Sequence, residues 1–317
     1  MILTVTANPA LDVTYRLDRL VPNHSHRARS VHQRAGGKGV NVARVLLRLG
    51  CETRAAVTVG GATGGLVRAD LGAAGMPHDL VEIAGESRRT VALVPDEDGQ
   101  ATLINEPGAP ISREEWARLR ELVDRLSASA SVVVFAGSLP PAAPDDGYAQ
   151  LVGLVAARGV PTVLDTSGVA LREGVVAGPS VVKPNAAELA ELAPTSGPAE
   201  GAAALRALGA RDVVVSLGSA GLLAVTDGGR WRARPSEAVS GNPTGAGDAV
   251  VAALAVGLRD GSRWADRLRE AAAVSASAVV APVAGDIDED HYRHELRAAR
   301  VSTVDGWEVL HGLGSHG

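Results

Sequence analysis

The sequence has a single cysteine, few aromatic residues and no excess of basic residues. Cys51 has no cysteine to pair with, so the chain has no intrachain disulfide and no thiolate metal cluster. Aromatic residues make up only 3 %, so Ala, Val and Leu must build the core, and the hydrophobic content of 46 % is sufficient for it. The net charge of −5 gives no electrostatic reason to expect nucleic acid or an anionic membrane as a partner.

Long apolar runs and a targeting pattern are also absent from the sequence. No apolar run approaches the ~20 residues of a membrane span. The first residues reach polar Asn8 and Asp12 early and have no basic region before them, unlike a signal peptide. These features predict a cytoplasmic protein. A length of 317 residues fits one large α/β domain with an added element.

Apolar runs alternate with helical patterns over much of the chain. They predict strands at residues 2–6, 54–59, 132–136, 162–165, 180–182 and 213–215. This alternation implies right-handed crossovers and a doubly wound, mostly parallel sheet with helices on both faces. Polar residues follow four of the strands: Ser138, Asp165, Lys183 and Ser216. Because ligands bind at the carboxyl ends of such strands, these residues predict a site there.

Two pairs of short strands have no helix between their members. Strands are expected at 13–17 and 28–33, and at 90–95 and 101–105 around a turn at 96–99. Together they predict a small sheet, formed by about 13–35 and 87–106, standing off a single domain of residues 1–317. Arg88 precedes the second pair of strands. Its guanidinium is either solvated at the edge of the sheet or binds a phosphate through two N–H groups.

Gly36-Gly37-Lys38-Gly39 comes before a helical pattern that begins near Asn41. A loop of this kind lets the backbone approach a ligand at a helix N-terminus. It is not a Walker A loop, because no Ser or Thr follows Lys38. A flexible hinge with a solvated Lys38 fits the same residues.

Gly245-Ala246-Gly247-Asp248 stands before an apolar helical run. The amides of the two glycines and of Ala246 can converge at the helix start, where the helix dipole favours an anion. Asp248 beside such a cradle is placed to take a proton from an alcohol. A tight turn with Asp248 as the N-cap is the alternative.

Two other functions could use the same segment: a nicotinamide-dependent dehydrogenase, or a sensor that binds a sugar or nucleotide without catalysis. A dinucleotide fingerprint is only half matched, because Val250 stands at its third small position. This argues against a nicotinamide-dependent dehydrogenase. A sugar or nucleotide sensor without catalytic activity would need the glycines but not Asp248.

Asn185 and Glu188 are three residues apart and share a helix face. Their oxygens suit a hard cation such as Mg²⁺, held partly by water and phosphate. Capping of the helix by Asn185 is the alternative.

In combination these segments resemble the ribokinase-like carbohydrate kinases, and within them the branch of 1-phosphofructokinase and tagatose-6-phosphate kinase. The matching motifs run in order over nearly the whole chain: Asn8-Pro9-Ala10-Leu11-Asp12, Gly36-Gly37-Lys38-Gly39-Val40-Asn41, Gly137-Ser138-Leu139-Pro140, Lys183-Pro184-Asn185 with Glu188, Ser216-Leu217-Gly218, and Thr244-Gly245-Ala246-Gly247-Asp248. Each motif is weak alone, but their joint order is specific.

The resemblance implies ATP-dependent phosphorylation of a phosphohexose, with fructose 1-phosphate converted to fructose 1,6-bisphosphate as the leading hypothesis. Tagatose 6-phosphate and fructose 6-phosphate are the alternatives, and a non-phosphorylated sugar or a nucleoside is a more distant one. Mg²⁺ is implied as a cofactor, and a monovalent cation such as K⁺ is left open. The small sheet would be a lid over the sugar and would pair with the lid of a second subunit in a homodimer.

The resemblance also assigns roles to single residues. Asp248 would be the general base, and the amides of Gly245, Ala246 and Gly247 would stabilise charge on the transferred group. Sugar-binding positions would be Asp12, Gly37, Lys38, Asn41, Arg88 and Ser138. Nucleotide positions would be Lys183, Asn185, Ser216, Gly218 and Gly221, and Glu188 with Asn185 would hold Mg²⁺. The chain departs from the family pattern at three positions: Thr90, Ala92 and Pro243.

Overall fold

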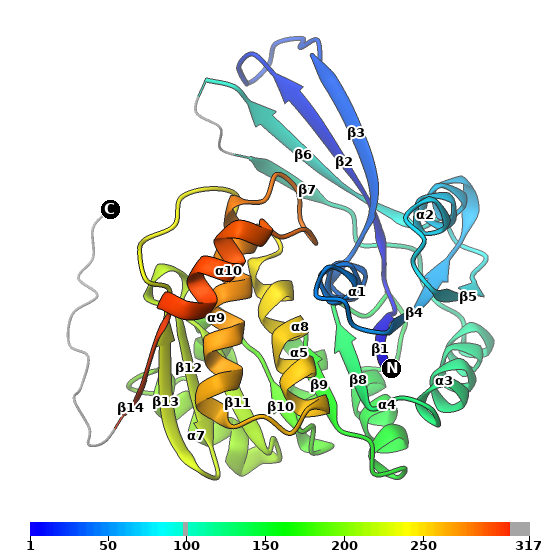
Figure 1. Cartoon of the computed structure of the whole chain (residues 1–317). Coiled ribbons are helices and arrows are strands. Elements are labelled where there is room, and N and C mark those ends of the chain that lie inside the picture. Colours follow the sequence, from blue (N-terminus) through cyan, green and yellow to red (C-terminus); the bar gives the residue numbers. More distant parts are fainter. Residues whose placement is uncertain (98–100, 305–317) are drawn as a thin grey trace.

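A ten-stranded sheet with helices on both faces forms the body of the molecule, and a four-stranded sheet stands off one edge of it (Figure 1). This is a computed structural model, and it describes residues 1–97 and 101–304. Part of the turn predicted at 96–99 lies outside the described residues, as do residues 305–317, for which the sequence predicts a tail after a short strand that begins near residue 301. The α/β fold predicted from the sequence is confirmed.

The large sheet is parallel over most of its width. In spatial order its strands are β14 (Arg300–Thr303), β13 (Gly229–Arg234), β12 (Leu222–Thr226), β11 (Asp212–Ser216), β10 (Val181–Val182), β9 (Thr162–Asp165), β8 (Val132–Ala136), β1 (Ile2–Thr6), β4 (Thr53–Val59) and β5 (His78–Glu82). From β11 to β5 every pair is parallel, whereas β11 to β14 pair antiparallel. A short strand from residue 301 was expected and corresponds to β14, whereas β12, β13 and β5 were not expected from the sequence.

Helices cover both faces of the large sheet because both faces of its strands are apolar. In β8, Val133 and Phe135 pack on one side, and Val132 and Val134 pack on the other. The first face is covered by α3 (Arg113–Ser127), α4 (Gly147–Ala156), α5 (Gly168–Val176), α6 (Ala186–Leu192) and α7 (Pro198–Leu208). The second is covered by α1 (Lys38–Arg48), α8 (Ala246–Arg259), α9 (Trp264–Val280) and α10 (Glu289–Ala298). None of the helices in the described part of the chain is both long and apolar enough to cross a membrane.

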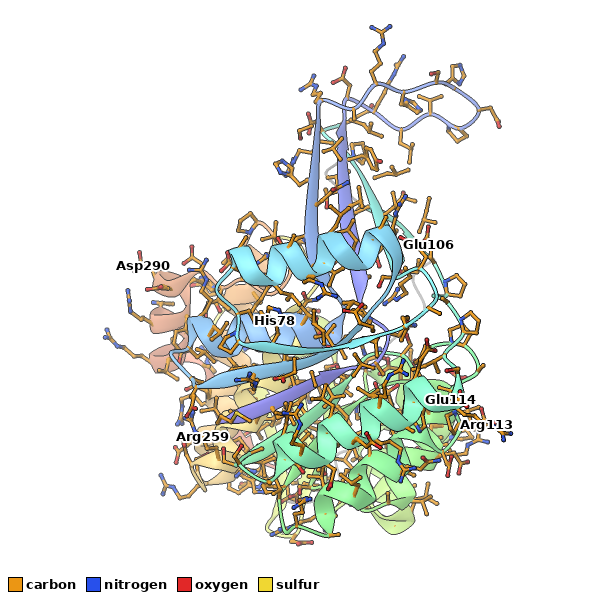
Figure 2. The ribbon with its side chains drawn as sticks, turned by 90° about the vertical axis from the view of Figure 1, so that its right-hand side faces the viewer. His78, Glu106, Arg113, Glu114, Arg259 and Asp290 are labelled. Atoms are coloured by element: carbon orange, nitrogen blue, oxygen red, sulfur yellow. The ribbon has the colours of Figure 1, made fainter. Side chains whose placement is uncertain are left out.

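The small sheet has the order β3-β2-β6-β7 and rises beside α2 (Gly61–Ala73), as Figures 1 and 2 show. Its strands are β2 (Ala10–Leu17), β3 (Ser30–Gly36), β6 (Arg88–Pro95) and β7 (Thr102–Asn105). Cross-strand register places Asp12 between Arg34 and Thr90, and Thr90 beside Asn105. Since directly paired residues point to the same face, these four side chains share one face of the small sheet.

Candidate active site

Asp248 lies in the first turn of α8 and is 6 % exposed. The Nδ2 of Asn41 donates a hydrogen bond to its Oδ2 at 2.9 Å. Burial raises the pKa of Asp248 to about 7, and Asp165 adds to the rise, while Lys38, Asn41 and Lys183 oppose it. A buried carboxyl that titrates near neutral pH is well suited to act as a general base.

Asp165, at the end of β9, is held between two lysines beside Asp248. Its Oδ1 lies 3.1 Å from Lys38 Nζ and 3.4 Å from Lys183 Nζ. Asp165 and Lys183 are almost completely buried, so each charge is balanced within the protein. Burial lowers the pKa of Lys38, but Asp165, Asp248 and Glu188 outweigh it and the net shift is upward. Lys38 therefore belongs to an ion-pair cluster and is not a solvated hinge residue.

The loop before α8 presents unpaired backbone donors. Gly245 is the N-cap in the left-handed conformation (φ 90°), and no side chain caps this helix end, so Asp248 is not the cap. The amide of Ala246 donates to the Pro243 carbonyl at 3.2 Å, whereas in the described residues those of Gly247 and Asp248 donate no hydrogen bond. A Cβ at Gly247 would lie 3.5 Å from Lys183 Nζ, which places this ammonium beside the loop. Free amides, a helix dipole and a lysine together suit an anion.

A cavity of about 580 Å³ opens between the small sheet and the large one. Its lining includes Lys38, Arg88, Asn105, Ser138 and Glu188. In Figure 2 the labelled Glu106, another lining residue, marks where the small sheet meets the body. Lys38 and Arg88 provide two cationic groups for a small anionic ligand, beside the carboxylates of Glu106 and Glu188 in the same lining.

Asp12 stands beside Arg88 on the small sheet. A Cβ at Gly36 would lie 1.9 Å from Asp12 Oδ2, so only glycine leaves room for this carboxylate. Burial raises the pKa of Asp12 to about 6, although Arg88, a hydrogen bond from Thr90, and Arg34 lower it. Arg88 donates through Nε to the Asn8 carbonyl at 3.1 Å, and its Nη1 lies 3.5 Å from Thr90 Oγ1. Thr90 therefore connects the carboxylate to the guanidinium.

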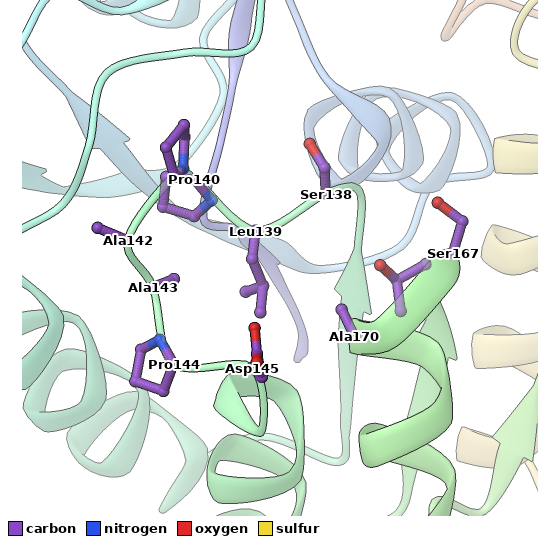
Figure 3. A pocket seen from close by; sticks show the side chains of 11 residues that line it. Ser138, Leu139, Pro140, Ala142, Ala143, Pro144, Asp145, Ser167 and Ala170 are labelled. Carbon is purple, nitrogen blue, oxygen red and sulfur yellow. The ribbon is translucent and has the colours of Figure 1, made fainter.

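A second cavity of about 310 Å³ adjoins the first and shares Ser138, Thr166 and Ser167 with it. Figure 3 shows Ser138 and Ser167 across from the proline-rich loop that runs to Asp145. The Oγ of Ser138 accepts a hydrogen bond from Asn8 Nδ2 at 3.1 Å. Asp145 is the one charged residue in this lining, so the cationic side chains Lys38 and Arg88 belong to the larger cavity.

The expected nucleotide residues lie at the neighbouring ends of β10 and β11. Asn185 and Ser216 form an isolated β-bridge, and the Ser216 amide donates to the Pro184 carbonyl at 3.0 Å. Gly218 and Gly221 begin and follow a short 3₁₀ turn, and a Cβ at Gly221 would lie 2.1 Å from the Ala233 carbonyl oxygen. Lys183 differs from these residues, because its ammonium is buried beside Asp165.

Asn185 and Glu188 cap α6 reciprocally, each side chain accepting a hydrogen bond from the other's amide at 2.8 Å. Two other carboxylate oxygens nearby take no part in this capping. Glu188 Oε1 lies 4.0 Å from Lys38 Nζ, and the buried Asp165 Oδ2 has no hydrogen-bond partner among the described residues. The described residues contain no group of three His, Cys, Asp or Glu that could hold a metal ion. Two separate carboxylates fit Mg²⁺, which usually keeps water and substrate phosphate as its other ligands.

Asp165 was expected at the strand-end site from the sequence, but the family resemblance assigned it no role. Three residues near the cavity also had no predicted role: Asn8, Thr90 and Asn105. The sequence carried a signal for Asp165, because a polar residue there ends a buried apolar strand. The other three depend on cross-strand register and long-range hydrogen bonds.

Comparisons with a family model, with curated proteins and with solved structures all point to carbohydrate kinases. A model described as the pfkB family carbohydrate kinase matches residues 5–289. The 1-phosphofructokinase of Xanthomonas campestris is 38 % identical over 267 residues, 81 % of this chain and 84 % of that protein. The tagatose-6-phosphate kinase of Staphylococcus epidermidis is 32 % identical over 96 % of this chain and 100 % of that protein. The crystal structure of phosphofructokinase-2 from Escherichia coli in complex with potassium superposes with a TM-score of 0.88 at 28 % identity, covering 93 % and 98 % of the two chains.

Proposed function

The chain belongs to the pfkB family of carbohydrate kinases, and we propose that it transfers the γ-phosphoryl group of ATP to a phosphohexose. The preferred substrate in this proposal is fructose 1-phosphate, and the product is fructose 1,6-bisphosphate. The observation that carries the proposal is the buried Asp248 beside the free amides and Lys183, next to a cavity that contains Lys38 and Arg88.

In the proposed reaction, Asp248 accepts the proton of the sugar's primary hydroxyl. The hydroxyl oxygen forms a bond to the γ-phosphorus, and the bond from that phosphorus to the leaving oxygen of ADP breaks. Charge on the transferred group is stabilised by the free amides at the start of α8, among them that of Gly247, and by Lys183, which are in place before the reaction, whereas the predicted amide of Ala246 is already bonded to the Pro243 carbonyl. Asn41 keeps the carboxylate of Asp248 oriented throughout.

Mg²⁺ is the cofactor that this chemistry requires. Glu188 would hold it as predicted, with Asp165 in place of the predicted Asn185, whose side-chain oxygen caps α6. When bound, the ion neutralises charge on the β- and γ-phosphates. A monovalent cation such as K⁺ remains part of the proposal, supported by the potassium complex of E. coli phosphofructokinase-2.

The choice of phosphohexose rests on the comparisons. Identity is higher to a 1-phosphofructokinase than to a tagatose-6-phosphate kinase, at 38 % against 32 %. Fructose 6-phosphate is supported by E. coli phosphofructokinase-2, which has been crystallised with that sugar. All three sugars have an alcohol to phosphorylate and a distal phosphate that Arg88 and Lys38 could bind.

We also propose a homodimer formed through the small sheet. Val31 and Ile104 are 48 % and 53 % exposed and lie on the face opposite Asp12. A tetrameric form of E. coli phosphofructokinase-2 supports assembly among relatives. Light scattering should give twice the chain mass, and Ile104→Lys should reduce it to that of a monomer; a monomeric parent protein would contradict the dimer.

A coupled assay of ADP release over a panel of sugars tests the proposed activity. We expect turnover with fructose 1-phosphate above that with tagatose 6-phosphate, fructose 6-phosphate and unphosphorylated fructose. A higher kcat/KM for another phosphohexose would revise the substrate, and no turnover of any phosphohexose would reject the function.

A further inference from the structure

Arg34 links two regions of the molecule that are far apart in the sequence. It lies on β3, paired in register with Asp12 on β2, and its side chain is half buried. Its Nη1 donates a hydrogen bond at 3.1 Å to the carbonyl oxygen of Ala284, a residue 250 positions away. A side chain of the small sheet therefore holds the backbone of the segment between α9 and α10.

The segment that Arg34 holds packs against the loop before α8. A Cβ at Gly245 would lie 3.0 Å from Ala284 Cα and 3.1 Å from Ala284 Cβ. A Cβ at Gly285 would lie 3.2 Å from both Cα and Oδ1 of Asn41. Residues 284–285 therefore support Gly245, which starts the anion-binding loop, and Asn41, which orients Asp248.

The backbone from which Arg34 extends is itself held firmly. The Ala35 amide donates to Asp70 Oδ2 at 3.0 Å, and Arg44 donates both to the Ala35 carbonyl and to Asp70. On the other side, Asp286 forms an ion pair with Arg48 at 2.9 Å, but the Arg48 side chain is 54 % exposed. Because exposed ion pairs contribute little, the hydrogen bond from Arg34 is the more effective restraint on this segment.

We propose that Arg34 is a positioning residue, whose guanidinium ties the root of the small sheet to Ala284 and thereby keeps Gly245 and Asn41 in place for phosphoryl transfer. The kinetic part of this inference rests on the proposed kinase function, whereas the structural part does not. Arg34 also places a positive charge near Asp12, so one side chain influences both the sugar side and the transfer side of the site.

Arg34→Met tests the inference, with Arg34→Lys as the conservative variant and His32→Met as the matched control. His32 lies two residues earlier on the same face and is exposed. Hydrogen exchange of the full chain without ligand should become faster in peptides covering 282–286 and 244–248 of Arg34→Met, and stay unchanged in His32→Met. Arg34→Lys should restore slow exchange in part, because it keeps a charged donor.

Steady-state kinetics give a second test, measured with the sugar phosphate that has the highest kcat/KM in the ADP-release assay. The kcat of Arg34→Met should fall about 10-fold, since small misplacements of catalytic groups cost up to roughly 10²-fold. The KM for ATP should change much less, and the pH at which sugar binding weakens should rise because Asp12 loses a nearby positive charge. Unchanged exchange in both peptides, or a kcat within about twofold of the parent, would overturn the inference. A parent protein that phosphorylates no sugar phosphate would reject the proposed function instead, and exchange alone would then decide the role of Arg34.

Discussion

The two halves of the candidate site are built differently. On the transfer side, Asp248, Asp165 and Lys183 are buried at the edge of the large sheet, Lys183 forms an ion pair with Asp165, and Asp248 accepts a hydrogen bond from Asn41. On the sugar side, Arg88 and Lys38 line an open cavity beneath a sheet that packs against the body at its root. The transfer side is organised before any ligand binds, whereas on the sugar side Arg88 is available for one. Lys38 belongs to both halves, because it lines the cavity and also pairs with Asp165. This difference is expected of an enzyme that must bind a soluble sugar phosphate and then exclude water from ATP.

The largest expected effect comes from the buried half. Asp248→Asn keeps the size of the side chain but removes the base, so kcat should fall by at least about 10²-fold, the lower range for general-base loss. ATP binding, measured by calorimetry, should stay largely intact. Asp260→Asn, at the exposed end of the same helix, serves as the control and should leave kcat unchanged. Near-normal turnover of Asp248→Asn would remove this residue from the mechanism.

A smaller effect, of a different kind, is expected from the open half. Arg88→Met should raise the KM for the sugar phosphate by about 10-fold or more, since a hydrogen bond to a charged group contributes roughly 1.5–3 kcal/mol. The kcat should change less, because Arg88 is not in the transfer cluster. Arg118→Met is the control: Arg118 donates to the Glu82 carbonyl on an exposed surface, outside the cavity. An equal loss for unphosphorylated fructose would show that Arg88 does not bind the phosphate.

The pH dependence should also reflect the buried half. Burial raises the pKa of Asp248 to about 7, so the carboxylate fraction, and with it kcat, should decline as the pH falls through this value. An Asp in water would lose its charge only near pH 4. A pH profile of kcat therefore distinguishes a buried base with a raised pKa from an ordinary aspartate. A kcat that stays constant from pH 8 down to pH 5 would contradict the assignment of Asp248 as the base.

The smallest effect should come from Thr90, the residue that connects Asp12 to Arg88. A hydrogen bond from Thr90 lowers the pKa of Asp12, which burial raises to about 6. Thr90→Val removes this bond, so the pKa should rise, and the KM for sugar should begin to increase at a slightly higher pH. The exposed Thr102→Val on β7 is the matched control. A shift of the KM profile toward lower pH would contradict this role.

Much of the large sheet could be predicted because its strands are continuous apolar runs. Strands β1, β8 and β9 have the predicted bounds, since both faces of each are buried. The hairpin of β12 and β13 was missed, although Asp227-Gly228 between apolar and alternating segments is a strong hairpin signal. Strand β5 was missed because the polar His78 and Asp79 begin an edge strand.

The site was predictable where its residues are local and not where they meet through the fold. Gly245 to Asp248 form one short motif, and so do Gly36 to Asn41. The ion-pair cluster joins Lys38 on α1, Asp165 at the end of β9 and Lys183 just after β10. Arg34 contacts Ala284, 250 positions away. No spacing rule in the sequence gives such contacts.

The product itself provides the most direct test of the central claim. Phosphorus-31 NMR of a reaction of fructose 1-phosphate with ATP and Mg²⁺ should show ADP and a sugar carrying two phosphate esters, at C1 and C6, in equal amounts. ADP with free inorganic phosphate and no second sugar phosphate would contradict the account, because it would show that the site transfers the phosphoryl group to water.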